Sequence, residues 1–265
     1  LINNYEIHIK NFNSDSKNST EYKNNTENNI QGLFQFNSSY PLKKNGNKYD
    51  SSLTPIFNLK INPSSNKNIK NFSSLVDYTN IYSINRIGSN DTLEGGESIT
   101  IGNEFKILNK QNDEEIFGLN LATSFRKDKN EDLSIMSSLG QKTSNIVGEM
   151  NLKTNEFIEF NYDFIADNNI GEFNYHKIKS NFKVNNFVTS FEFVEENNLI
   201  GSESFLANET SYNINNNQDL IFRTRKNKKT DLTEYYDLIY QYKMDCLVAG
   251  IKYNKKYYKD RDIQP

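Results

Sequence analysis

The sequence predicts an all-β protein whose strands follow one another as an antiparallel meander. Apolar and polar residues alternate along most of the chain, whereas the spacing of an amphipathic helix is nearly absent. Tyrosine and phenylalanine, which favour strands, bring the aromatic content to 13%, and the chain has no tryptophan. Short polar turns separate the alternating stretches in the second half of the chain, as hairpin connections do.

The alternating stretches predict about thirteen strands. In chain order they cover residues 3–9, 30–37, 53–61, 97–108, 115–126, 144–153, 156–166, 171–183, 186–196, 203–213, 218–226, 231–242 and 245–257. Two long polar stretches, 11–29 and 63–74, contain little to bury and are expected to be solvated loops.

The clearest alternation runs through EFIEFNYDFIADNN, from Glu156 to Asn169. Successive side chains of a strand point to opposite faces, so every second residue shares a face. One face of this segment carries Ile158, Phe160, Tyr162 and Phe164, and the other carries Glu159, Asn161 and Asp163. The segment DLTEYYDLIYQYK, from Asp231 to Lys243, repeats the design, with Leu238 and Tyr240 opposite Asp237 and Gln241.

A meander of this length can fold in two ways. It can form a soluble sandwich or barrel with apolar residues inside, or a transmembrane barrel with apolar residues outside and polar residues inside. Strands of about 9–12 residues fit a tilted crossing of a bilayer, whereas about 5–6 residues is typical of soluble strands. Hydrophobic residues make up only 35% of the chain, which is low for a large soluble core. The pattern therefore favours the membrane barrel, with the apolar positions above facing lipid and the polar positions facing the lumen.

Other classes of function find little support in the residues. A formal net charge of −3 does not suggest a surface for nucleic acid. The two histidines, His8 and His176, are far apart on different strands. His176 alternates with Glu172 and Asn174, so it is expected on a polar face. The sequence contains no recognised catalytic, metal-binding or phosphate-binding motif. We therefore expect no enzyme activity, catalytic residue, metal site or cofactor.

Two segments of the chain resemble the LPS-assembly protein LptD family, which translocates lipopolysaccharide (LPS) in the outer membrane. The tail YKMDCLVAGIKYNKKYYKDRDIQP is similar to the Y-x-D-D-C and D-R-D-I-x-P patterns of this family. The matching residues there are Asp245, Cys246, Asp260, Arg261, Asp262 and Pro265. Residues 78–107 resemble a second family segment at Asn80, Arg86, Glu94, Gly95 and Gly96. Apart from the resemblance, the two glycines are expected to form a tight turn or bulge that begins the next strand.

The resemblance implies that residues 1–265 are the C-terminal portion of an LptD-like β-barrel domain, without the periplasmic N-terminal domain and the last strand. It implies delivery of LPS to the outer leaflet of a Gram-negative outer membrane, through a barrel with a lateral exit. The implied partners are LPS, the outer-membrane bilayer, an LptE-like plug lipoprotein and the periplasmic Lpt bridge components. The family's C-terminal cysteines form disulfides with the periplasmic domain, so Cys246 is expected to pair with a cysteine outside this sequence.

Two alternatives remain open at this stage. The chain could belong to another outer-membrane β-barrel, such as a porin or a receptor. It could also be a soluble β-rich surface protein that binds carbohydrate. Under the barrel interpretation, the carboxylates on the polar face predict an acidic lumen that does not retain phosphorylated head groups.

Overall fold

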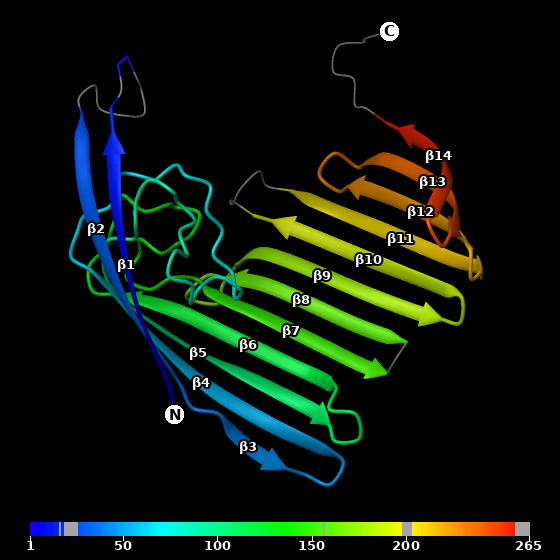
Figure 1. The fold of residues 1–265 in the computed structure, drawn as a ribbon, viewed down its shortest axis with the longest axis horizontal. Coiled ribbons are helices and arrows are strands. Elements are labelled where there is room, and N and C mark those ends of the chain that lie inside the picture. Colours follow the sequence, from blue (N-terminus) through cyan, green and yellow to red (C-terminus); the bar gives the residue numbers. More distant parts are fainter. Residues whose placement is uncertain (16, 19–25, 156, 198–202, 258–265) are drawn as a thin grey trace.

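The computed structural model of the chain describes residues 1–15, 17–18, 26–155, 157–197 and 203–257. All regular structure in these residues is β-strand, and fourteen strands form one antiparallel sheet (Figure 1). The strands are β1 (Ile2–Ser14), β2 (Glu27–Ser39), β3 (Leu42–Asn45), β4 (Tyr49–Asn62), β5 (Gly96–Asn109), β6 (Glu115–Arg126), β7 (Ile146–Asn155), β8 (Ile158–Ala166), β9 (Phe173–Val184), β10 (Phe187–Glu196), β11 (Ser204–Asn215), β12 (Gln218–Asn227), β13 (Leu232–Met244) and β14 (Leu247–Lys256).

The predicted fold class is confirmed. Apart from β3, which pairs only with β4, each strand lies beside the next one in the chain from β1 to β14. β1 and β14 form the two edges of the sheet, so the sheet formed by the described residues is open. The short strand β3 was not predicted. β1 and β2 also extend further than predicted, so they take up both ends of the stretch 11–29 that was expected to be a loop. No helix in the described part of the chain is long and apolar enough to cross a membrane.

Connections alternate between the two ends of the sheet, as an antiparallel meander requires. At one end, residues 185–186, 216–217 and 245–246 form tight turns between neighbouring strands. At the other end lie the longer connections, which include residues 63–95 between β4 and β5 and residues 127–145 between β6 and β7. Figure 1 shows these two connections gathered beside one another at the ends of β4–β7.

The strand register separates two faces of the sheet. One face carries Asn58, Thr100 and Ser124, which are paired across β4, β5 and β6 and are buried beneath the two long connections. We call it the loop face. The opposite, apolar face carries Leu59, Ile99 and Phe125 at the neighbouring pairing positions. Many large side chains on the apolar face remain exposed, among them Ile99, Ile101, Phe125, Phe191, Leu206, Phe222, Leu238 and Tyr253.

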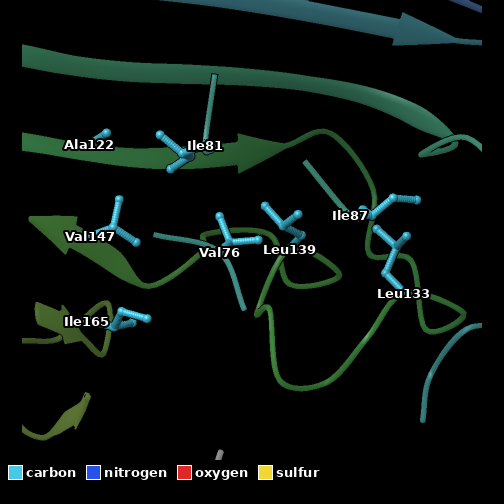
Figure 2. Close-up of a cluster of buried hydrophobic side chains, with 8 residues drawn as sticks. All are labelled: Val76, Ile81, Ile87, Ala122, Leu133, Leu139, Val147 and Ile165. Carbon is cyan, nitrogen blue, oxygen red and sulfur yellow. The ribbon is translucent and has the colours of Figure 1, made fainter. Parts of the chain in front are cut away.

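In the described residues, a cluster of buried apolar side chains lies between the loop face and the two long connections, rather than between two layers of strands. Val76, Ile81 and Ile87 come from the β4–β5 connection, and Leu133 and Leu139 come from the β6–β7 connection. They pack together with the loop-face residues Ala122, Val147 and Ile165 (Figure 2). The expectation that residues 63–74 are solvated is therefore wrong in part. Asn66 and Ser74 are buried, and Ile69 packs against this cluster.

Candidate functional site: a buried charge network on the loop face

A buried carboxylate, Glu94, accepts hydrogen bonds from two arginines. Arg86 donates from Nε to Oε2 and from Nη2 to Oε1, both at 2.7 Å, which is a bidentate pair. The Nη2 of Arg126 donates to the same Oε1. All three side chains are at least 97% buried, because their exposed fractions are 0%, 3% and 3%. Glu94 and Arg86 belong to the β4–β5 connection, and Arg126 ends β6.

Arg86 also fastens the β4–β5 connection to the sheet. Its guanidinium donates to the Oγ atom of Ser98 at 2.8 Å and the Oγ1 atom of Thr100 at 2.8 Å, both on β5. It also donates to Ser124 Oγ on β6 at 3.1 Å. Thr100 and Ser124 are register partners and Ser98 is two residues before Thr100, so all three hydroxyls reach the loop face. Each nitrogen of the Arg86 guanidinium therefore has a hydrogen-bond acceptor, which a buried cation requires.

Arg126 joins the two long connections to each other. Its Nη1 donates to the carbonyl oxygen of Gly95 at 2.6 Å, in the β4–β5 connection. Its Nε donates to the carbonyl oxygen of Leu139 at 2.9 Å, in the β6–β7 connection. Arg126 therefore donates to two buried backbone carbonyl oxygens and to one oxygen of the buried Glu94 carboxylate.

A second group of polar side chains holds the β4–β5 connection from β2 and β4. Gln31 Oε1 accepts from the backbone N–H of Leu93 at 2.7 Å, and Gln35 Nε2 donates to the carbonyl oxygen of Tyr82 at 3.0 Å. Lys60 Nζ donates to the carbonyl oxygen of Ser83, and Asn62 Nδ2 donates to that of Glu94 at 3.0 Å. Gln31, Gln35, Lys60 and Asn62 each expose 1% or less of their surface. The connection thus receives from the sheet the backbone hydrogen bonds that an irregular buried segment needs.

Glycines permit the close approach of the connection to the sheet. Gly96 has a φ of 90° and begins β5, as predicted for the start of the strand. A Cβ atom on Gly95 would lie 2.7 Å from the carbonyl oxygen of Ser64 and 2.9 Å from the amide nitrogen of Asn66. On Gly102, a Cβ atom would collide with the hydroxyl of Tyr82 and with the Leu121 backbone. Side chains at these places would therefore displace the connection.

Two arginines and a lysine control the ionisation of Glu94. Burial by itself would raise the pKa of this carboxyl group. The charge and hydrogen bonds of Arg86, with the charges of Lys60 and Arg126, outweigh that effect and lower the pKa from 4.5 to about 2. Glu94 is therefore ionised over the physiological range. In contrast, burial raises the pKa of Tyr78 and Tyr82, so both phenols stay neutral.

The lowered pKa predicts how docking of the connection depends on pH. Because the folded-state pKa lies below that of the unfolded chain, the stabilisation by Glu94 is complete above pH 4.5 and is lost as the pH falls toward 2. We expect amide hydrogens of residues 75–93 to remain protected at pH 4 and to lose protection near pH 2, once the intrinsic exchange rate is taken into account. Loss of protection already at pH 5 would contradict this assignment.

The structure brings together some of the residues that the family resemblance singled out. Arg86, Glu94 and Gly95 meet in the charge network, and Gly96 adjoins it. Asn80 lies elsewhere in the same connection, where its Nδ2 donates to the carbonyl oxygen of Leu75 at 3.0 Å. Asp245 and the exposed, free thiol of Cys246 form the tight turn between β13 and β14. The predicted positions Asp260, Arg261, Asp262 and Pro265 lie outside the described residues.

The predicted wall residues fall on two faces as the alternation suggests. Through the pairs Ala122–Val147 and Val147–Ile165, the register continues the loop face to β8 and on to β13. The loop face thus carries Glu159, Asn161, Asp163, Asp237 and Gln241, and the apolar face carries Ile158, Phe160, Tyr162, Phe164, Leu238 and Tyr240.

The expectation of an acidic lumen needs correction, because cations stand opposite the carboxylates. Asp237 forms an ion pair with Lys252 at 2.8 Å, and Asp163 is the register partner of Lys177. Elsewhere on this face, Arg223 pairs with Glu209 at 2.8 Å. Opposite charges on neighbouring strands of the same face attract each other. The sequence of a single strand shows its carboxylates but not the cations that the next strand places beside them.

The expected position of His176 is wrong. It lies on the apolar face opposite Phe164, and its Nδ1 is 2.7 Å from the hydroxyl of Tyr162. The cause is a β-bulge: Phe173 pairs with Ala166 and Tyr175 pairs with Ile165, so Asn174 is an extra residue. The prediction assumed unbroken alternation from Glu172 through Asn174 to His176. The extra residue breaks that alternation, so His176 was assigned to the wrong face.

Sequence reasoning missed the sheet's contribution to the charge network. Lys60 and Arg126 occupy polar positions in alternating strands, as ordinary lumen-facing or solvated residues would. Their burial depends on a connection that packs over them from another part of the chain. One signal was available: the C-terminal half of the β4–β5 connection carries Arg86, Glu94 and the pair Gly95–Gly96, which resemble a family segment. In the described residues, no group of three or more His, Cys, Asp or Glu side chains is arranged to hold a metal ion.

Comparisons with known proteins bear on the identity of the chain. A family model, LptD, described as LPS transport system D, matches residues 3–217. None of the curated proteins compared with the chain matches it. Among solved structures, a multiply substituted porin of Rh. blastica is 8% identical, with a TM-score of 0.37 over 93% of this chain and 94% of its own. A second variant of that porin is 6% identical, with a TM-score of 0.30 over 94% of this chain and 100% of its own.

The TM-scores are too low to support an argument, so the assignment depends on the family model. That match covers most of the chain, from β1 to the β11–β12 turn, and includes the whole charge network. It excludes the tail motif around Cys246. On the strength of this match, the chain belongs to the LptD family of LPS transport proteins.

Proposed function

We propose that this sheet is part of the wall of an outer-membrane barrel that delivers LPS to the outer leaflet of a Gram-negative bacterium, with a lateral exit for the lipid. One observation carries the proposal beyond family membership. The sheet has one face of exposed apolar side chains and one of paired charges and amides. A transmembrane barrel needs hydrocarbon-compatible residues outside and polar residues inside.

The two faces suit the two parts of the transported molecule. Acyl chains are compatible with the apolar face and the bilayer, whereas phosphorylated sugars need a hydrated path. On the loop face, cations and carboxylates alternate in pairs such as Lys177 with Glu192 and Asp237 with Lys252. Each cation of these pairs already has a counter-charge, so a passing phosphate gains little by binding to it. Movement of the glycolipid requires no bond to form or break, and no catalytic residue is proposed.

The lengths of the connections suggest which end of the sheet is extracellular and which is periplasmic. Outer-membrane barrels have short periplasmic turns and longer extracellular loops. We therefore place the β4–β5 and β6–β7 connections at the extracellular end, and the turn of Asp245 and Cys246 at the periplasmic end. The loop face of β9–β14 carries no described connection, which leaves room in a closed barrel for the LptE-like plug lipoprotein. Periplasmic Lpt bridge components would deliver LPS at the short-turn end.

The position of Cys246 supports a disulfide with a periplasmic domain of the natural protein. The thiol is exposed in a tight turn at the proposed periplasmic end. We expect Cys246→Ser to remove one disulfide-linked species from a non-reducing gel of the natural protein. If the band pattern is the same for both proteins, Cys246 has no covalent partner.

The proposed function is tested by depleting the natural protein from its own bacterium and following newly made LPS. We expect new LPS to accumulate inside the outer membrane, while other barrel proteins still insert. Reintroducing the gene restores surface LPS. If surface LPS is unaffected by depletion but uptake of small solutes falls, the protein is a porin and the proposal is wrong.

A further inference from the structure

The β4–β5 connection reaches deep along the loop face. Its Tyr82 packs against Gly102 on β5, and its Tyr78 donates to Glu104 Oε1 at 3.2 Å. Gly102 is six residues from Gly96, where β5 begins, so the connection extends about 20 Å along the strand. In an outer-membrane barrel, whose apolar band is about 25 Å tall, such a segment would cross most of the interior.

The charges that hold this connection are unbalanced. Two buried guanidinium groups, those of Arg86 and Arg126, share the single buried carboxylate of Glu94, and the side chain of Lys60 is buried close to them. The other buried carboxylates of the described chain, Asp219 and Asp237, are on β12 and β13. Removing the charge of Glu94 would therefore leave two guanidinium cations buried together without their buried counter-charge, which a low-dielectric site does not tolerate.

From this imbalance we propose that Glu94 is a positioning residue whose single carboxylate keeps the β4–β5 connection docked, and that the docked connection keeps the barrel interior closed to solutes. The proposal rests on the barrel orientation in the proposed function. The apolar contacts of Val76, Ile81 and Ile87 also favour docking, but they supply no counter-charge to the two buried arginines. When Glu94 is neutral, the connection leaves the loop face and the cations become hydrated.

The test compares Glu94→Gln with Glu97→Gln in the natural, full-length protein. Glu97 is a matched control, because it lies three residues away, is half exposed and pairs with the exposed Lys127 at 3.1 Å. We expect Glu94→Gln to speed amide exchange in residues 75–93 by about a hundredfold to a few thousandfold, the range that corresponds to a buried charge losing its partner. Strands β8–β13 should exchange as in the unchanged protein. In planar bilayers, the Glu94→Gln protein should conduct ions where the unchanged and Glu97→Gln proteins remain closed.

Each outcome decides the proposal. If Glu94→Gln exchanges and conducts like Glu97→Gln, the proposal is wrong. Glu94→Asp keeps the charge with a shorter reach and is expected to lie between the unchanged protein and Glu94→Gln. If both Glu94 variants lose the protection of β8–β13 as well, Glu94 supports the whole barrel rather than docking, and the proposal is again overturned. Neither readout uses LPS, so a failure here is distinguishable from a failure of LPS delivery in the depletion experiment.

Discussion

Replacing Leu238 with arginine is expected to lower the free energy of unfolding of the membrane-inserted barrel by about 2–4 kcal/mol. Leu238 is the central residue of β13 (Leu232–Met244), lies on the apolar face and is 44% exposed. Under the proposed orientation, the new guanidinium would lie near the bilayer midplane without water or a counter-ion. Equilibrium unfolding in lipid vesicles, followed by the shift of the folded band on a gel, measures the effect.

Gln241→Arg is the matched control for this prediction. Gln241 is on the same strand but on the loop face, where Asp219 is its register partner on β12. We expect its cost to stay within about 0.5 kcal/mol, as for a solvated substitution. Equal costs for the two variants would mean that the faces do not differ in environment, and the barrel orientation would be wrong.

Arg126→Ala is expected to destabilise the docked connections by about 3–5 kcal/mol, because it removes one partner from a buried, hydrogen-bonded charge network. The carbonyl oxygens of Gly95 and Leu139 and one oxygen of Glu94 would lose a donor together. Both long connections should loosen, since Arg126 bonds to each of them. Amide exchange of Asn130 and Leu133, which hydrogen-bond within the β6–β7 connection, is the measurement.

The neighbouring residue provides the control for Arg126. Lys127 forms an exposed pair with Glu97, so Lys127→Ala should change exchange by the equivalent of about 0–1 kcal/mol. If Arg126→Ala speeds exchange no more than Lys127→Ala does, Arg126 does not join the connections to the sheet. Each variant removes one positive charge. A difference between their exchange rates therefore reflects the burial and hydrogen bonds of Arg126 rather than the change in net charge.

The strands could be predicted because their signal is local. An alternating residue reports its face through its immediate neighbours, so β8 and β13 were assigned with their two faces from sequence. The prediction failed where an extra residue interrupts the count, as Asn174 does before His176. The strand β3 has no buried side chain, so it leaves no such pattern.

The charge network depends on contacts between residues far apart in the chain. Arg86 and Glu94 could be singled out by their resemblance to a family segment, but their partners could not. Arg126 lies 32 residues from Glu94, and Gln31 lies 62 residues from Leu93. The burial of Asn66 and Ser74 likewise accompanies the packing of apolar residues that follow them in the connection, such as Val76 and Ile81, against the sheet. The composition of a short stretch of sequence does not indicate contacts between residues so far apart in the chain.

The central claim is that the apolar face of this sheet contacts hydrocarbon while the loop face contacts water. The most direct measurement places a fluorophore on Phe160→Cys or on Asn161→Cys in the natural protein, with Cys246 and any other native cysteine replaced by serine, in lipid vesicles. These adjacent residues lie on opposite faces of β8. We predict that a lipid-borne quencher dims the label at position 160 and that an aqueous quencher dims the label at position 161. The reverse pattern, or equal quenching by both agents, would contradict the account.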